Sequence, residues 1–154
     1  MVEEGKPAPD FELASDSGER IRLSDLRGRP VVLYFYPKDD TPGCTKQACS
    51  FRDAYGEFEE RGATILGVSR DDEASHVRFK EKYGLPFTLL ADPDHAVAEQ
   101  YDVWVEKNNY GKKSMGIKRS TFVIDAEGNV ARAMYGVSPE GHADVVLEAL
   151  PAGE

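Results

Sequence analysis

The chain is short of cysteine, histidine, tryptophan and positive charge, and two of these shortages exclude whole classes of protein. Its 154 residues include 2 Cys, 3 His and 1 Trp, and 19 Lys and Arg stand against 28 Asp and Glu, a formal net charge of -9. Two cysteines are too few for the disulfide framework of a small secreted domain. The acidic balance argues against a nucleic-acid partner, because phosphates need a basic face, and against an anionic membrane surface.

Long apolar runs are missing as well. No stretch approaches the roughly 20 apolar residues of a membrane span, and the N-terminal segment MVEEGKPAPDF lacks the apolar run of a secretory signal. We therefore expect a cytoplasmic protein, in which a disulfide would be transient rather than structural. The 40% of hydrophobic residues suffice for a core, and we expect a single domain over residues 1–154.

The order of the apolar segments predicts an α/β fold. Apolar or alternating runs predict strands at 11–13, 20–23, 30–36, 63–68, 87–90, 120–124 and 130–135. The first two should form an N-terminal β-hairpin extension. Apolar residues at helical spacing predict helices at 45–61, 72–83 and 92–101, and a last one from Ser138 whose inner face carries Val145, Val146, Ala149 and Leu150. This order predicts a central mixed β-sheet flanked by helices.

One stretch carries no apolar pattern. Residues 105–116 (VEKNNYGKKSMG) are polar and contain glycine, so we expect a surface loop there.

The two cysteines lie in one segment, Pro37-Lys-Asp-Asp-Thr41-Pro-Gly-Cys44-Thr-Lys-Gln-Ala-Cys49, where a predicted strand gives way to a helix. If Cys44 begins that helix, its side chain points toward the body of the domain and Cys49 points mostly outward. Free N–H groups and the positive end of the helix dipole then favour a thiolate at Cys44. The two Cα atoms would lie about 8.6 Å apart, whereas a disulfide needs less than about 7 Å. Bonding would therefore require the first helical turns to unwind.

The same cysteines, and the other candidate residues, also fit interpretations without a catalytic role. Cysteine is often only a small buried hydrophobe, the spacing C-x4-C without a third ligand disfavours zinc, and it is not the C-x-x-C of thioredoxins. His76, His95 and His142 lack i,i+4 ligand spacing, so we interpret them as structural or surface residues. Asp39-Asp40 lacks a calcium-loop pattern, and we interpret it as a cap or a solvated turn.

The segment Pro37-x-x-x-Thr41-x-x-Cys44 resembles the active-site motif of peroxiredoxins. Together with Cys49 it resembles the bacterioferritin-comigratory-protein subfamily, also called peroxiredoxin Q. The similarity extends over nearly the whole chain and includes the segment Arg119-Ser-Thr-Phe-Val-Ile-Asp125. It implies a thioredoxin-like fold, no metal and no bound organic cofactor.

The resemblance also implies roles for individual residues. Cys44 would be the peroxidatic cysteine, whose thiolate attacks the O–O bond of hydrogen peroxide or an alkyl hydroperoxide and becomes a sulfenic acid. Thr41 and Arg119 would hold the peroxide together with the N–H groups of Gly43 and Cys44. Pro37 would shield the reactive sulfur.

For Cys49 the resemblance implies the role of resolving cysteine. It would form an intramolecular disulfide with Cys44, which thioredoxin or a similar dithiol protein would reduce. We expect a monomer. Two rival functions stay open from the sequence: a peroxide-sensing thiol–disulfide regulator that passes oxidation to a protein partner, and a thioredoxin-fold binding module whose cysteines are merely packed.

Overall fold

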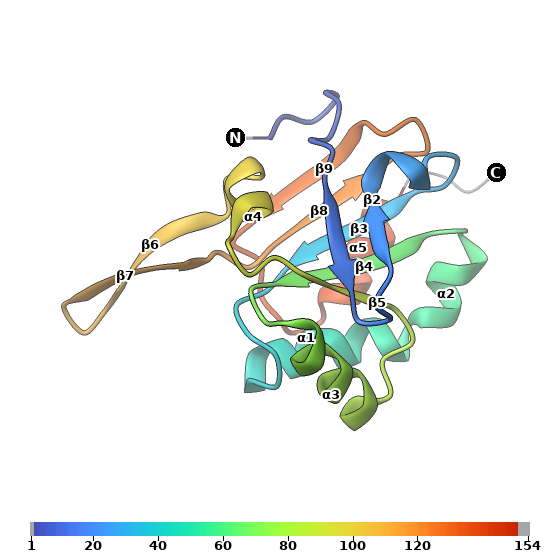
Figure 1. Ribbon diagram of the computed structural model, residues 1–154. Helices are drawn as coiled ribbons and strands as arrows, with labels where there is room; N and C mark the ends of the chain where they lie inside the picture. Colours follow the sequence, from blue (N-terminus) through green and yellow to red (C-terminus); the bar gives the residue numbers. More distant parts are fainter. Residues whose placement is uncertain (1, 151–154) are drawn as a thin grey trace.

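The computed structural model describes residues 2–150, apart from the side chain of Asn109, and its centre is a seven-stranded mixed sheet (Figure 1). The strand order is β2-β1-β5-β4-β3-β8-β9. The strands are β1 Glu12–Ser15, β2 Arg20–Arg22, β3 Val31–Phe35, β4 Thr64–Ser69, β5 Thr88–Ala91, β6 Trp104–Asn109, β7 Lys112–Ile117, β8 Ser120–Ile124 and β9 Val130–Tyr135. The helices are α1 Pro42–Asp53, α2 Tyr55–Glu60, α3 Glu73–Tyr83, α4 Ala96–Gln100 and α5 His142–Ala149, with a 3-10 turn at Leu23–Leu26.

Strand pairing confirms the mixed sheet. β3, β4 and β5 run parallel, connected by helices, whereas β8 runs antiparallel to β3 and β9 antiparallel to β8. The predicted N-terminal hairpin of β1 and β2 also forms, and β1 pairs antiparallel with β5. The hairpin is therefore the edge of the main sheet rather than a separate extension.

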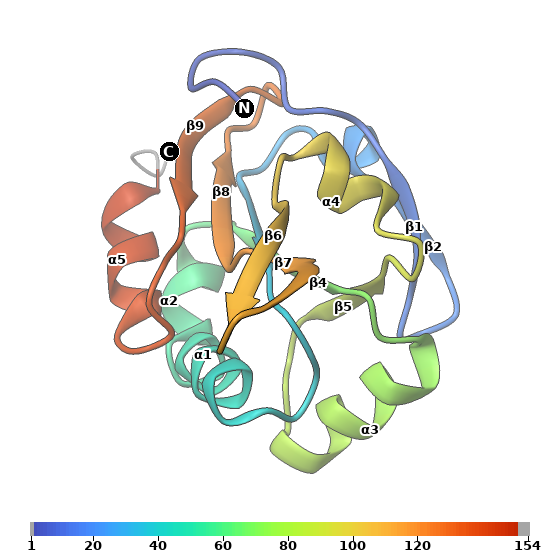
Figure 2. The ribbon, with the colours of Figure 1, turned by 90° about the vertical axis from the view of Figure 1, so that its left-hand side faces the viewer.

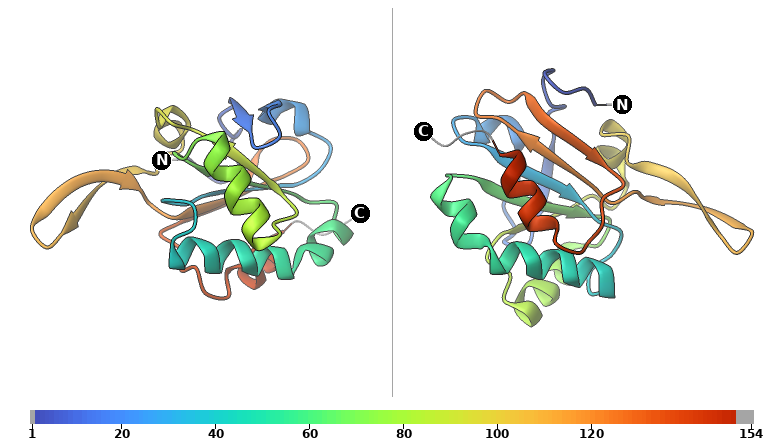
Figure 3. Two further views of the ribbon diagram at one scale, coloured as in Figure 1. Left: turned by 60° about the horizontal axis from the view of Figure 1, so that its bottom comes forward. Right: turned by 180° about the vertical axis from the view of Figure 1, so that it is seen from behind.

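Two apolar layers enclose the sheet because side chains alternate along the buried strands. The even-numbered residues Val32 to Tyr36 face the layer of α1, α2, α3 and α5, whereas the odd-numbered residues Val31 to Phe35 face α4 and the N-terminal segment. Figure 3 shows α1 and α5 side by side beneath the sheet. No helix within residues 2–150 is long and apolar enough to cross a membrane.

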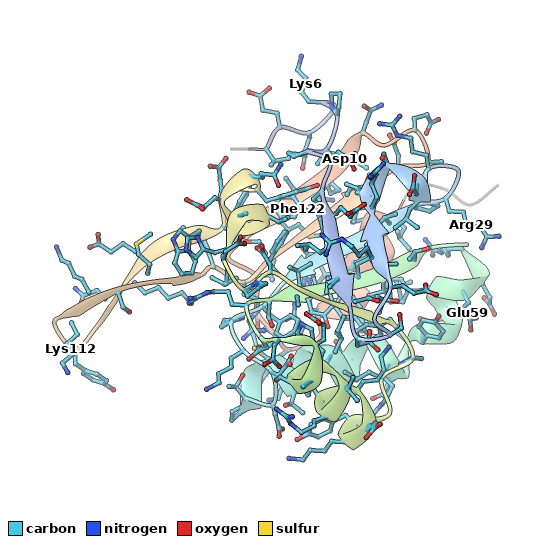
Figure 4. All side chains as sticks on the ribbon, in the orientation of Figure 1. Lys6, Asp10, Arg29, Glu59, Lys112 and Phe122 are labelled. Atoms are coloured by element: carbon cyan, nitrogen blue, oxygen red, sulfur yellow. The ribbon has the colours of Figure 1, made fainter. Side chains whose placement is uncertain are left out.

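The prediction of a surface loop at 105–116 is wrong, because these residues form the β6–β7 hairpin that projects from the body. Tyr110 and Gly111 make its turn with φ angles of 54° and 83°, as a two-residue type I′ turn requires. Figure 4 places Lys112 at the tip, far from the buried Phe122. The sequence pattern failed here because residues 105–116 belong to neither apolar core, so this part of the two strands carries no alternation.

Three helix boundaries also differ from the predictions. The helix expected at 45–61 is two helices, α1 and α2, because Ala54 leaves helical geometry with φ -98° and ψ 8°. The helix expected from Asp92 begins at Ala96, since His95 adopts a left-handed conformation. Asp92 still caps it from a distance, accepting hydrogen bonds from the N–H groups of Val97 and Ala98 at 3.2 and 2.9 Å.

The last helix begins later than Ser138, at His142, after Gly141 with φ 62°. Val145 is exposed and does not belong to the inner stripe, contrary to the prediction. The buried side chains of α5 are His142, Ala143, Val146 and Leu147.

The Tyr34 hydroxyl is buried without a hydrogen-bond partner among the described residues. The ring packs against Phe51 at a centroid distance of 4.8 Å, and burial raises the pKa of the phenol. An unpaired buried hydroxyl costs roughly 1–3 kcal/mol. We therefore expect Tyr34→Phe to raise the free energy of unfolding by about 1 kcal/mol, measured by urea denaturation. A loss of stability would show that the hydroxyl has a partner.

Candidate active site

Cys44 lies at the beginning of α1, in the third helical position. Thr41 is the N-cap residue, Pro42 follows as the first helical residue, and the Thr45 N–H donates to the Thr41 carbonyl at 2.8 Å. Proline suits this place because the first N–H of a helix has no helical partner. The N–H groups of Gly43 and Cys44 are also among those that the helix itself leaves unpaired. The Cys44 side chain is 1% exposed and is a free thiol.

Arg119 contacts the sulfur directly. Its Nη2 donates to Cys44 Sγ at 3.4 Å, and its Nη1 donates to Gln47 Oε1 at 2.6 Å. Gln47 is fully buried one turn after Cys44, so it holds the guanidinium in a fixed orientation. Because the glutamine is neutral, the positive charge of Arg119 has no counter-charge in that partner and acts on the sulfur.

The sheet explains how Arg119 reaches α1. β8 pairs antiparallel with β3 in a register that sets Ser120 opposite Phe35. Arg119, just before β8, therefore lies at the same end of the sheet as the loop that follows β3. Glycine at position 43 keeps the approach open, since a Cβ there would lie 3.1 Å from Arg119 Nη2.

Thr41 and Pro37 belong to the loop between β3 and α1, residues 36–41, which leads to Cys44. The Thr41 hydroxyl donates its proton to the Lys38 carbonyl at 3.0 Å, so its oxygen lone pairs are free to accept. Pro37 follows the last strand residues and is half-buried. The structure thus brings Cys44, Arg119 and Thr41 to one end of the sheet.

Cys49 lies on the same continuous helix as Cys44. It is half-buried rather than buried, as helical geometry predicts, and is also a free thiol. Its neighbours along α1, Ala48 and Phe51, belong to the core beneath the sheet.

Sequence reasoning misses several residues around the site. Asp39, expected as a cap or a solvated turn, is 7% exposed and accepts hydrogen bonds from Tyr36, Ser75 and His76. A negative charge next to a motif is an ambiguous signal, because only the tertiary structure shows whether it faces water.

Lys107 is missed as well, because it lies in the hairpin that the sequence predicts to be a loop. Its side chain lies across Gly116, and burial and then Arg119 lower its pKa, whereas Cys44 acts in the opposite direction. These influences place a second cation, after Arg119, in the electrostatic neighbourhood of the sulfur.

Two of the three histidines are buried, and the third is a surface residue as expected. His95 stacks on Trp104 at a centroid distance of 4.0 Å, and Arg70 lies 4.7 Å over the Trp104 ring.

Within residues 2–150, no group of three or more His, Cys, Asp or Glu side chains is arranged to hold a metal ion.

His142 packs behind the site and hydrogen-bonds Thr121 Oγ1 through Nε2 at 2.7 Å. Burial, and secondarily the charge of Arg119, lowers the pKa of His142 to about 4. Its ordinary pKa is about 6.5. The unfolded chain therefore binds a proton between these values that the folded chain does not, and stability falls as the pH drops below about 6.5.

We expect His142→Gln, which keeps a polar partner for Thr121 but cannot titrate, to weaken this acid sensitivity. Between pH 7 and pH 4.5 the wild type should lose about 2–3 kcal/mol more unfolding free energy than the variant. Urea denaturation at both pH values measures this difference. Equal losses of unfolding free energy in the two proteins would mean that His142 does not cause the acid sensitivity.

Comparisons with known proteins agree with this geometry. Residues 4–133 match the AhpC/TSA family. The chain is 53% identical to a putative peroxiredoxin bcp of Coxiella burnetii, covering 95% of this chain and 97% of that one. It is 51% identical to the peroxiredoxin Bcp of Bacillus subtilis, covering 97% and 95%.

Solved structures agree as well. The bacterioferritin comigratory protein of Xanthomonas campestris matches with a TM-score of 0.89 at 43% identity, covering 96% of each chain. A cysteine-to-serine mutant of Xylella fastidiosa PrxQ matches with a TM-score of 0.91 at 36% identity, covering 96% of this chain and 94% of that one. These likenesses, together with a buried thiol held beside an arginine at a helix start, lead to one conclusion. The chain belongs to the AhpC/TSA family and is a thioredoxin-fold thiol peroxidase of the bacterioferritin-comigratory-protein, or peroxiredoxin Q, type.

Proposed function

We propose that the chain reduces hydrogen peroxide and organic hydroperoxides through a sulfenic acid at Cys44. The thiolate attacks the distal oxygen, the O–O bond breaks, and the other oxygen leaves as water or an alcohol after taking up a proton. The sulfur is thereby oxidised by two electrons and the peroxide is reduced by two. The observation that carries this proposal is the 3.4 Å contact between Arg119 Nη2 and Cys44 Sγ.

Arg119 serves two purposes in this proposal. Its charge favours the thiolate over the thiol, and its guanidinium stabilises the negative charge that develops on the leaving oxygen. The first effect is limited, because ionising a free thiol completely at pH 7 increases the thiolate fraction only about thirty-fold. The larger share of the acceleration must come from the second effect.

Thr41 and the helix start complete the peroxide site. The Thr41 hydroxyl donates its hydrogen bond to the Lys38 carbonyl. Its oxygen can therefore accept a hydrogen bond from the hydroperoxide. The N–H groups of Gly43 and Cys44 act as donors to its oxygens. We propose that Pro37 limits the access of water to the sulfur.

Cys49 then resolves the sulfenic acid. Its thiol attacks Cys44, an intramolecular disulfide forms, and water leaves. Both residues lie within the unbroken helix α1, and five helical residues span more than a disulfide allows. The beginning of α1 must therefore unwind before the bond closes.

A dithiol protein such as thioredoxin would reduce this disulfide by exchange and return α1 to its helical state. We propose that the protein acts as a cytoplasmic monomer and that its whole length of 154 residues forms one domain.

Arg119→Met tests the role of the guanidinium. We expect the rate constant of Cys44 oxidation by hydrogen peroxide to fall by about 100-fold or more, because a transition-state donor is lost. Stopped-flow fluorescence or competition kinetics measures it. Arg70→Met is the matched control, since that arginine lies over Trp104, and it should change the rate less than about 3-fold. Equal effects of the two variants would contradict the assignment.

The cysteine variants test the two oxidation steps. Cys44→Ser should abolish peroxide consumption. In Cys49→Ser one equivalent of peroxide should add one oxygen by intact mass, whereas the wild type should lose two hydrogens and lose amide protection at the beginning of α1. A helix equally protected in both redox forms would contradict the unwinding step. Trapped mixed disulfides with a protein other than a thioredoxin-like reductant would favour the regulatory function instead.

A further inference from the structure

A buried ion pair joins Asp39, in the loop of residues 36–41, to His76 of α3. His76 of α3 and Asp39 are 0% and 4% exposed at their side chains, and His76 Nδ1 lies 2.7 Å from Asp39 Oδ2. The same carboxylate accepts hydrogen bonds from the hydroxyls of Tyr36 at 2.5 Å and Ser75 at 2.8 Å. Figure 2 shows this loop passing between α1 and α3.

The contacts of His76 determine where its protons are. Its Nε2 lies 2.8 Å from the Leu90 carbonyl, which can only accept, so Nε2 carries a hydrogen. A carboxylate at Asp39, which accepts from the hydroxyls of Tyr36 and Ser75, favours a further donor at Nδ1. With a hydrogen on both ring nitrogens, His76 is an imidazolium paired with that carboxylate. The neighbouring carboxylate accordingly raises the pKa of His76 against the opposing effect of burial.

One peptide group connects this pair to the peroxide site. The Asp39 N–H donates to Asp71 Oδ2 at 2.8 Å, and the Lys38 carbonyl of the same peptide group accepts the Thr41 hydroxyl at 3.0 Å. A peptide group is planar and rigid. Holding Asp39 at its side chain and its N–H therefore also sets the direction of the carbonyl that orients Thr41.

We propose that the buried Asp39–His76 pair is a positioning device that aims the Thr41 oxygen at the hydroperoxide. This inference rests on the proposed function, because it assigns a purpose to the scaffold around that site. Asp39 and His76 touch no reacting atom and act only through the loop. Their removal impairs the reaction with peroxide, which needs Thr41, and spares a reaction of Cys44 that does not need it.

The variant Asp39→Asn removes the charge and keeps the shape. We expect the rate constant of Cys44 oxidation by hydrogen peroxide to fall roughly 10-fold or more, since small misplacements of a positioning group have effects of this size. Alkylation of Cys44 by iodoacetamide, measured in a Cys49→Ser background, should change less than about 3-fold, because it uses no peroxide-binding group. Equal losses in both reactions would overturn the proposal, since they would mean general damage to the site.

Asp40→Asn is the matched control. Asp40 is the next residue of the loop and also reaches α3, but its contacts with Lys82 and Tyr83 are exposed. In this variant, the rate constants of Cys44 oxidation by peroxide and of Cys44 alkylation should both stay close to those of the wild type. If the wild type itself failed to react with peroxide, the proposed function would be wrong. A slow Asp39 variant beside a wild type that reacts concerns only the positioning role of the pair.

The double variant Asp39→Ala/His76→Leu separates positioning from stability. Removing both partners leaves no unpaired buried charge, so the double variant should unfold at a higher temperature than either single variant. Its peroxide reaction should remain slow, because only the hydrogen bond from the Asp39 N–H to Asp71 then holds the Lys38–Asp39 peptide. A double variant that regains both the stability and the rate of the wild type would make the pair merely structural.

Protonation provides an independent readout. The charged groups facing His76 are Asp39 of the loop and Asp71 from the turn before α3; Tyr36, just after β3, contributes a phenol whose pKa burial raises, so it stays neutral. Since the pKa of His76 is raised on folding, the imidazolium persists below that value and is lost as the pH rises through it. The peroxide rate should then decline on the alkaline side while alkylation does not. Nitrogen-15 NMR at neutral pH should show both His76 nitrogens protonated, and a neutral ring would overturn the proposal.

Discussion

The contact between the Arg119 guanidinium and the Cys44 sulfur is the interaction on which the proposed chemistry depends. The two residues are 75 positions apart in the chain, and the antiparallel register of β3 and β8 joins them at one end of the sheet. Gly43 leaves room for the arginine, and Gln47 orients it without neutralising it. The fold thus sets a directed positive charge beside a buried thiol.

In the proposed reaction cycle, helix α1 has to satisfy two opposing requirements. Its apolar side, with Ala48 and Phe51 in the core, holds Cys44 against Arg119. In the resolving step that we propose, the same turns open so that Cys49 can reach the sulfur. A helix of this length is marginal by itself, and the break at Ala54 separates it from α2, so it can rearrange without disturbing its neighbour.

The loop before α1 and the end of α1 are both anchored to α3. Before α1, Asp39 and Asp40 are bound to α3 through His76, Ser75, Lys82 and Tyr83. Near its end, Arg52 Nη1 donates to the Tyr83 carbonyl at 2.7 Å. Both anchors lie on α3, which belongs to the rigid core through Phe79. The segment that we propose to unwind is thus attached at both ends to one fixed element.

The hairpin and the loop show why parts of the protein escaped prediction. The strands β6 and β7 carry polar residues on both faces, so they lack the alternation by which a strand is recognised, and their turn was the only local signal. Asp39 carries no pattern at all. Its burial depends on His76, which lies 37 positions away in the chain, and no local rule links them.

The sequence by itself determined the strands of the central sheet, the pairing of an N-terminal hairpin and the placement of Cys44 at a helix start, because apolar periodicity, turn residues and proline act over a few residues. It also determined that Cys44 and Cys49 could not bond within an intact helix, since that follows from helical geometry alone. Only the tertiary structure decided how Arg119 meets the sulfur, that Asp39 is buried and paired, and that residues 105–116 are a hairpin. Those outcomes depend on strand register and on contacts between distant segments, and they exist only after the chain has folded.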